Sequence, residues 1–90
     1  MLNAIPRRTS SVASRALDGE AILVNPEQGK VTVVNGVGAR LWELMDGQRS
    51  IADMARVIAD EYKVSLIKAE ADSLSFCRDL AGRGLLTLDS

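Results

Sequence analysis

The sequence lacks most of the side chains that enzymes use. It contains no histidine, so the commonest general base and metal ligand are missing. Cys77 is the single cysteine, which excludes an intrachain disulfide and a zinc site built from paired cysteines. Gly36 and Gly38 follow a strand-like segment but complete neither GxGxxG nor the P-loop motif. We therefore expect no catalytic residue, no metal and no cofactor.

Long apolar runs and a large net charge are also lacking. No run approaches the roughly 20 apolar residues of a membrane-spanning helix, and the N-terminal segment has no apolar centre of the kind found in secretory signals. The net charge of -1 provides little attraction to nucleic acid. These features favour a cytoplasmic protein that does not bind membranes or nucleic acid.

Aromatic residues make up only 3% of the chain, whereas hydrophobic residues make up 47%. A chain of 90 residues with this composition is long enough for one small domain with an aliphatic core. Residues 1–11 contain Pro6 and show no hydrophobic period, and we expect them to form a flexible tail. Residues 12–90 then form the domain.

Two strong strand patterns and one weak pattern follow the tail. Residues 12–17 are the weak candidate, Asp18-Gly19 is a hairpin turn signal, and residues 21–25 are rich in aliphatic side chains. A second turn leads to residues 30–34, the third strand. Short turns of this kind predict an antiparallel meander in which the third strand has one free edge.

Three helices are predicted after the strands. The first lies between Gly36 and Gly47, and the second starts after Ser50, which forms a capping-box pattern with Asp53. The third lies within residues 66–83, and residues 85–88 form a short terminal strand. The order indicates an α+β fold of the winged helix-turn-helix type, with a three-stranded antiparallel sheet followed by three helices.

This arrangement favours peptide binding. Residues 31–34 of this strand contain neither proline nor a charged residue, so an extended peptide can add to the edge of the strand while the third helix forms a wall. The sequence does not determine which margin of that helix faces the strand, and we choose the margin that carries Phe76. The predicted peptide-binding residues are Lys30, Val31, Thr32, Val33 and Val34 of the strand, and Asp72, Ser75, Phe76, Asp79, Leu80 and Arg83 of the helix.

Two alternatives remain open at this point. The second and third helices have the arrangement of a winged-helix DNA-binding regulator, but the charges of the third helix sum to zero, which is unfavourable beside phosphates. A structural homodimer, in which strand edges pair between copies, is the other alternative.

The order and spacing of several short motifs resemble the PqqD-like family over residues 16–88. The matching residues are Val34-Asn35, Gly38, Leu41-Trp42, Asp46-Gly47, Asp72, Phe76, Leu80 and Gly84-Leu85-Leu86. Ser73 and Cys77 depart from the family pattern, in which aliphatic residues are common. The resemblance implies a recognition element for ribosomally made, modified peptides (RiPPs). Such an element holds the leader of a precursor peptide and delivers the precursor to a partner, often a radical-SAM enzyme or, in lasso-peptide systems, a leader peptidase.

Overall fold

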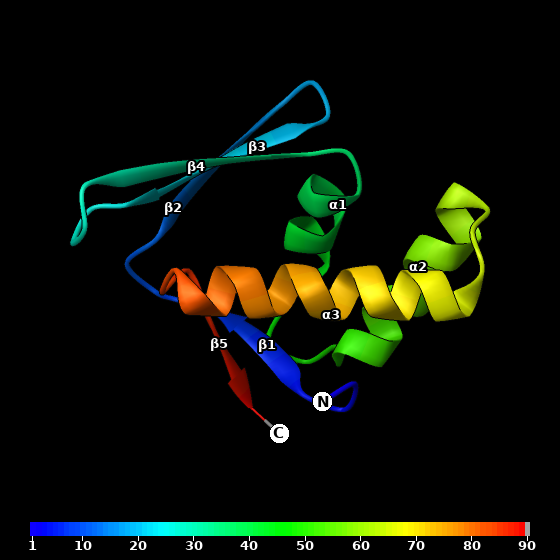
Figure 1. Ribbon diagram of the computed structural model, residues 1–90. Coiled ribbons are helices and arrows are strands. Elements are labelled where there is room, and N and C mark those ends of the chain that lie inside the picture. The colour runs from blue at the N-terminus through cyan, green and yellow to red at the C-terminus, as the bar shows by residue number, and fades with distance from the viewer. Residues whose placement is uncertain (90) are drawn as a thin grey trace.

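The computed structural model describes residues 1–89, and Figure 1 shows their arrangement. Within these residues the chain forms five strands and three helices. Their order is β1 (Ile5–Arg8), β2 (Ala13–Leu17), β3 (Glu20–Asn25), β4 (Lys30–Asn35), α1 (Val37–Leu44), α2 (Ile51–Tyr62), α3 (Leu66–Gly82) and β5 (Leu86–Asp89).

The three central strands form an antiparallel sheet in the order β2-β3-β4. Leu17 lies opposite Glu20, so Asp18 and Gly19 alone connect β2 to β3. Their φ angles are 27° and 79°, as a tight hairpin with two positive φ values requires. The predicted meander is thus confirmed. Because three helices follow the meander, the predicted α+β class is confirmed as well.

Local capping interactions determine where the longer helices begin. The Ser50 hydroxyl accepts a hydrogen bond from the Asp53 N–H, and the Asp53 carboxylate accepts one from the Ser50 N–H, both at 3.1 Å. The predicted capping box of α2 is therefore confirmed. Ser65 caps α3 in a similar way, because its hydroxyl accepts the N–H of Lys68 at 3.1 Å.

The N-terminal residues differ from our expectation of a flexible tail. Residues 5–8 form β1, which pairs with β5 in a second, two-stranded sheet. Ala4 is fully buried, and its carbonyl accepts the N–H of Ile51 at 2.9 Å, so the segment also satisfies a donor in the first turn of α2. Pro6 is compatible with this strand because a two-stranded sheet has an edge that needs no donor.

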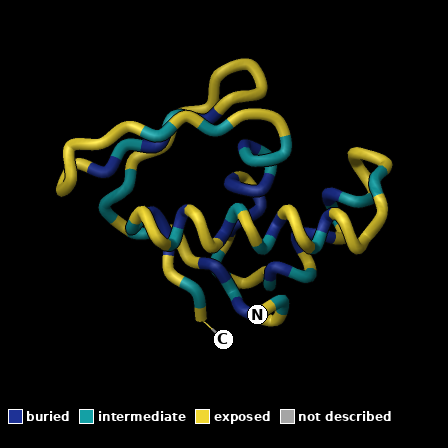
Figure 2. Tube along the Cα trace, viewed as in Figure 1, coloured by how far each residue is buried: buried dark blue, intermediate teal, exposed yellow. Residues whose placement is uncertain are grey.

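The core lies where the helices meet the two sheets. Helix α1 contacts β3, β4, α2 and α3, and α3 also contacts β5. In Figure 1 the three-stranded sheet lies on one side of α3 and the β1–β5 pair on the other. Figure 2 shows buried residues along the inward faces of the helices and mostly exposed residues along β2. Fully buried side chains include Leu23, Leu41, Ile51, Met54, Ile58, Leu80, Leu85 and Leu86.

The helices within residues 1–89 are too short or too polar to cross a bilayer.

Candidate functional site

The outer edge of β4 is the first component of the candidate site. Within residues 1–89, β4 pairs with β3 and with no strand on its other side. The Gly36 N–H donates to the Gly19 carbonyl at 3.1 Å, so these two residues form a hydrogen-bonded pair two positions beyond the register pair Ala21–Val34. Hydrogen-bonded pairs alternate in an antiparallel ladder. Thr32 and Val34 therefore direct their backbone groups toward β3.

Val31 and Val33 consequently direct their backbone N–H and C=O groups away from the sheet. Their side chains lie on its outer face, where they are 62% and 57% exposed. Thr32 and Val34 are half-buried and lie on the opposite face. The β4 edge thus offers unpaired main-chain groups flanked by apolar side chains.

Helix α3 provides a wall beside this edge through Phe76. A Cβ atom added at Gly38 would lie 3.0 Å from the Cε1 atom of Phe76 and 3.5 Å from the Cβ atom of Val34. The Phe76 ring therefore packs over the start of α1 on the side where β4 passes. The Phe76 margin of α3 thus lies toward the start of α1, beside Val34 of β4. The close approach also explains why position 38 is glycine.

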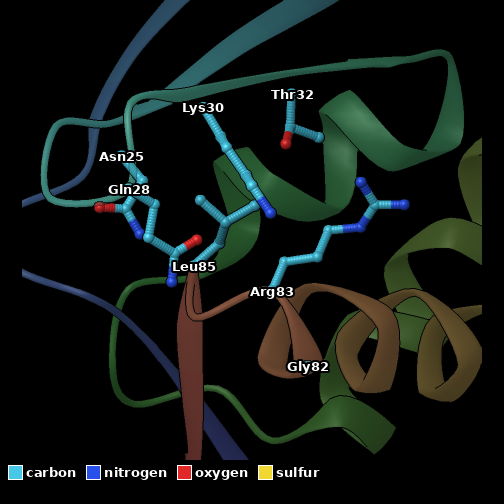
Figure 3. Close-up of a pocket in the computed structure, with 7 residues that line it drawn as sticks. All are labelled: Asn25, Gln28, Lys30, Thr32, Gly82, Arg83 and Leu85. Atoms are coloured by element: carbon cyan, nitrogen blue, oxygen red, sulfur yellow. The ribbon is translucent and has the colours of Figure 1, made fainter.

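A pocket of about 290 Å³ lies between the start of β4 and the end of α3. Figure 3 shows Lys30 and Arg83 extending into the same space from these two elements. Asn25 is 4% exposed, and its Oδ1 atom accepts the N–H of Glu27 at 3.1 Å, which orients its amide. The lining residues are Asn25, Gln28, Lys30, Thr32, Gly82, Arg83 and Leu85.

The predicted acidic residues of α3 lie on its surface in ion pairs. Asp79 and Arg83 are joined at 3.3 Å, and Lys68 and Asp72 at 3.2 Å. All four side chains are more than half exposed, so each pair contributes only a few tenths of a kcal/mol. Ser75 is also exposed, farther round the helix from the core.

Leu80 differs from the other predicted site residues. Its side chain is 1% exposed and belongs to the hydrophobic core, because position 80 lies on the face of α3 that also carries Ala69 and Cys77. We therefore correct the assignment: Leu80 is a core residue and presents no surface to a peptide.

Sequence reasoning missed four residues that line the pocket. Asn25 ends β3 and Gln28 lies in the β3–β4 turn, whereas Gly82 ends α3 and Leu85 immediately precedes β5. The sequence signals for the turn and the helix end are clear individually, but they do not indicate that these two segments meet. Only the tertiary packing brings them together.

The single cysteine of the chain lies in the hydrophobic core. Cys77 is fully buried, and burial raises the pKa of its thiol to about 11. The thiol is therefore protonated near neutral pH, as is typical of a small core residue.

A protein-family model matches most of this chain. The family described as coenzyme PQQ synthesis protein D (PqqD) matches residues 20–86, from the start of β3 to the start of β5. The chain belongs to the PqqD family. The match spans the β4 edge, the Phe76 wall and the pocket, so the predicted resemblance is confirmed across the candidate site. A comparison with curated proteins gave no match.

Three solved structures resemble this PqqD-family chain. TbiB1 in complex with the TbiA(beta) leader peptide has a TM-score of 0.83 and 29% identity, with 89% of this chain and 93% of TbiB1 covered. A lasso peptide synthetase B1 complexed with the leader peptide has a TM-score of 0.83 and 23% identity, with coverage of 93% and 99%. The PqqD part of Methylobacterium extorquens PqqCD, a stand-alone RiPP recognition element, has a TM-score of 0.76 and 23% identity, with coverage of 91% and 87%. The latter two establish a shared fold.

Proposed function

We propose that this chain is a non-catalytic adaptor that binds the leader of a ribosomally made precursor peptide. The leader adds as a strand to β4, and α3 forms the wall of the groove. The observation that carries the proposal is the free β4 edge, whose outward groups on Val31 and Val33 lie beside the Phe76 wall. TbiB1 supports it, since that relative was solved with a leader peptide.

The energetics require side-chain anchors as well as main-chain pairing. A peptide that becomes ordered on binding loses about 2–5 kcal/mol. Each new main-chain hydrogen bond contributes only about 1 kcal/mol net. The exposed Val31 and Val33 side chains, together with the half-buried Val34 and Phe76, offer apolar contacts on both faces of an added strand. Affinity should therefore depend on a few apolar residues of the leader.

The proposal extends to a partner enzyme. A bound leader leaves the rest of the precursor free, so the adaptor can present it to a modifying enzyme such as a radical-SAM protein, or to a leader peptidase. No reaction is assigned to the chain itself.

Hydrogen exchange of backbone amides provides a direct test, because the register separates two kinds of amide on one strand. In the free protein, the amides of Val31 and Val33 should exchange quickly, whereas those of Thr32 and Val34 should be protected by β3. Where a neighbouring gene encodes a short precursor peptide, its leader segment should slow exchange at Val31 and Val33 selectively. Tight binding without added protection at these two amides would contradict strand addition at β4.

Two alternatives give different outcomes in related measurements. DNA binding predicts an affinity that falls steeply with salt, whereas a largely apolar groove predicts a shallow dependence. None of the three similar structures is described as a DNA-binding protein. A homodimer that pairs its β4 edges predicts that saturating leader converts dimer to monomer. A dimer that the leader does not change would contradict competition for that edge.

A further inference from the structure

We propose that the pocket at the Lys30 end of β4 binds a carboxylate side chain of the added peptide strand. This inference rests on the proposed function and specifies the chemistry of the peptide. It predicts that the leader carries an aspartate or glutamate two residues from an apolar residue.

The polar groups around the pocket are mainly hydrogen-bond donors. Lys30 contributes an ammonium group, Arg83 a guanidinium group and Thr32 a hydroxyl. Lys30 forms no ion pair with any residue in the range 1–89. The buried Asn25 uses its oxygen within the turn, so its NH₂ group is the part that remains for a ligand. A donor-rich pocket of this kind favours an acceptor with negative charge.

The nearby carboxylates leave room for an incoming anion. Asp79 pairs with Arg83 at 3.3 Å, but both side chains are more than half exposed and the pair is weak. Glu27 lies in the preceding turn and is exposed, and it is not among the residues that line the pocket. With Lys30 and Arg83 against Asp79, the local charge favours a carboxylate.

The register of β4 fixes where this carboxylate lies along the peptide. Residues that are directly opposite in neighbouring strands place their side chains on the same face of a sheet. The peptide residue opposite Thr32 therefore directs its side chain into the pocket. The residue opposite Val34 directs its side chain toward Phe76, which is an apolar environment. These two peptide positions are i and i+2, whether the peptide runs parallel or antiparallel to β4.

Selection from a displayed library of random 12-residue peptides tests the inference without knowledge of the natural leader. Peptides selected by the wild-type protein should be enriched in an acidic residue two positions from an apolar one. A synthetic peptide from this pool is then compared with its Glu→Gln analogue. We expect the glutamate form to bind on the order of fivefold more tightly to the wild type.

The same peptide pair is then measured on protein variants. Lys30→Gln should reduce the preference for glutamate toward one. The double variant Arg83→Gln/Asp79→Asn should also reduce the preference for glutamate. Asp79→Asn is included because the Asp79 carboxylate would otherwise be left without its partner. Arg78→Gln is the matched control for Lys30→Gln, since Arg78 is exposed on the opposite side of α3 and its replacement also removes one positive charge. The control should retain the preference, and circular dichroism checks that each variant is folded.

The outcomes separate this inference from the proposed function. If no peptide binds the wild type and the genome-encoded leader also fails, peptide binding itself is wrong. If peptides bind but show no preference for glutamate, the carboxylate pocket is wrong and strand addition stands. A preference that survives Lys30→Gln, or that is lost equally in Arg78→Gln, also overturns the pocket assignment.

Discussion

Replacement of Val33 by proline should abolish one backbone donor at the β4 edge while leaving the fold intact. The ladder alternation directs the Val33 N–H away from β3, so the substitution breaks no hydrogen bond within the sheet. The Val33 side chain is 57% exposed, so little core packing is lost. Proline is tolerated at edge positions of this kind, and we expect a stability loss of about 1 kcal/mol from the poorer strand propensity.

Val33→Pro should also weaken binding of the leader peptide. One main-chain hydrogen bond contributes about 1 kcal/mol net, which corresponds to about fivefold in Kd. The pyrrolidine ring also occupies the space where the carbonyl of the added strand would lie, so fivefold is the minimum that we expect. Isothermal titration of the leader peptide into wild type and variant measures this change, and urea unfolding confirms that the variant is folded.

Thr32→Pro is the matched control on the neighbouring residue. The Thr32 N–H points toward β3, so proline there leaves a carbonyl of β3 without its donor and should lower the free energy of unfolding by about 1–3 kcal/mol. Val33→Pro should therefore be the more stable of the two variants and the weaker binder. A folded Val33→Pro protein that binds the leader as tightly as wild type would refute the use of this edge. A larger stability loss for Val33→Pro than for Thr32→Pro would refute the register argument.

Three further predictions concern the wall, the N-terminal strand and acid stability. Gly38→Ala should lower the free energy of unfolding by about 1 kcal/mol and weaken leader binding, because the added Cβ atom would lie 3.0 Å from Phe76. Gly82→Ala is the control: its added Cβ atom has no atom within 4 Å, so urea unfolding should show no loss of stability. Removal of residues 1–8 should lower the melting temperature strongly, since it removes β1 and a backbone acceptor for α2, and an unchanged melting temperature would contradict the pairing with β5. Hydrogen bonds from Ser50 hold the pKa of Asp53 below its usual value of 3.8. The stability that this carboxylate contributes is therefore present above pH 3.8 and is lost as the pH falls below that value. Asp53→Asn should make the free energy of unfolding less dependent on pH in this range, and an unchanged pH dependence would contradict the role of Asp53.

Much of the fold could be predicted because its signals are local. Asp18-Gly19 determines a hairpin between adjacent segments, and Ser50 with Asp53 begins a helix through contacts three residues apart. Strand β1 lacks such a signal. Its partner β5 is far away in sequence, as the ion pair between Arg7 and Asp89 across 82 positions illustrates. A short segment that contains a proline and two arginines has the composition of a flexible tail, and its pairing with β5 cannot be predicted from the segment alone.

The candidate site was predictable in part for a related reason. The edge position of β4 follows from the meander, which local turns determine. The rotation of α3 about its axis is set by packing. The periodicity of α3 alone placed Phe76 and Leu80 together, although Phe76 packs against the start of α1 and Leu80 lies in the core. The pocket around Asn25 required the end of α3 to meet the β3–β4 turn, which no local pattern indicates.

The pairing of β1 with β5 has a consequence for how the protein can be tethered. Ile5 lies opposite Asp89, so linkers attached at either end of the described chain would leave from neighbouring points. These points lie on the other side of α3 from the three-stranded sheet (Figure 1). Fusion to a second protein through either terminus would therefore hold the groove in nearly the same place and leave β4 unobstructed. The order of the two proteins along a fused chain should matter less than the length of the linker between them.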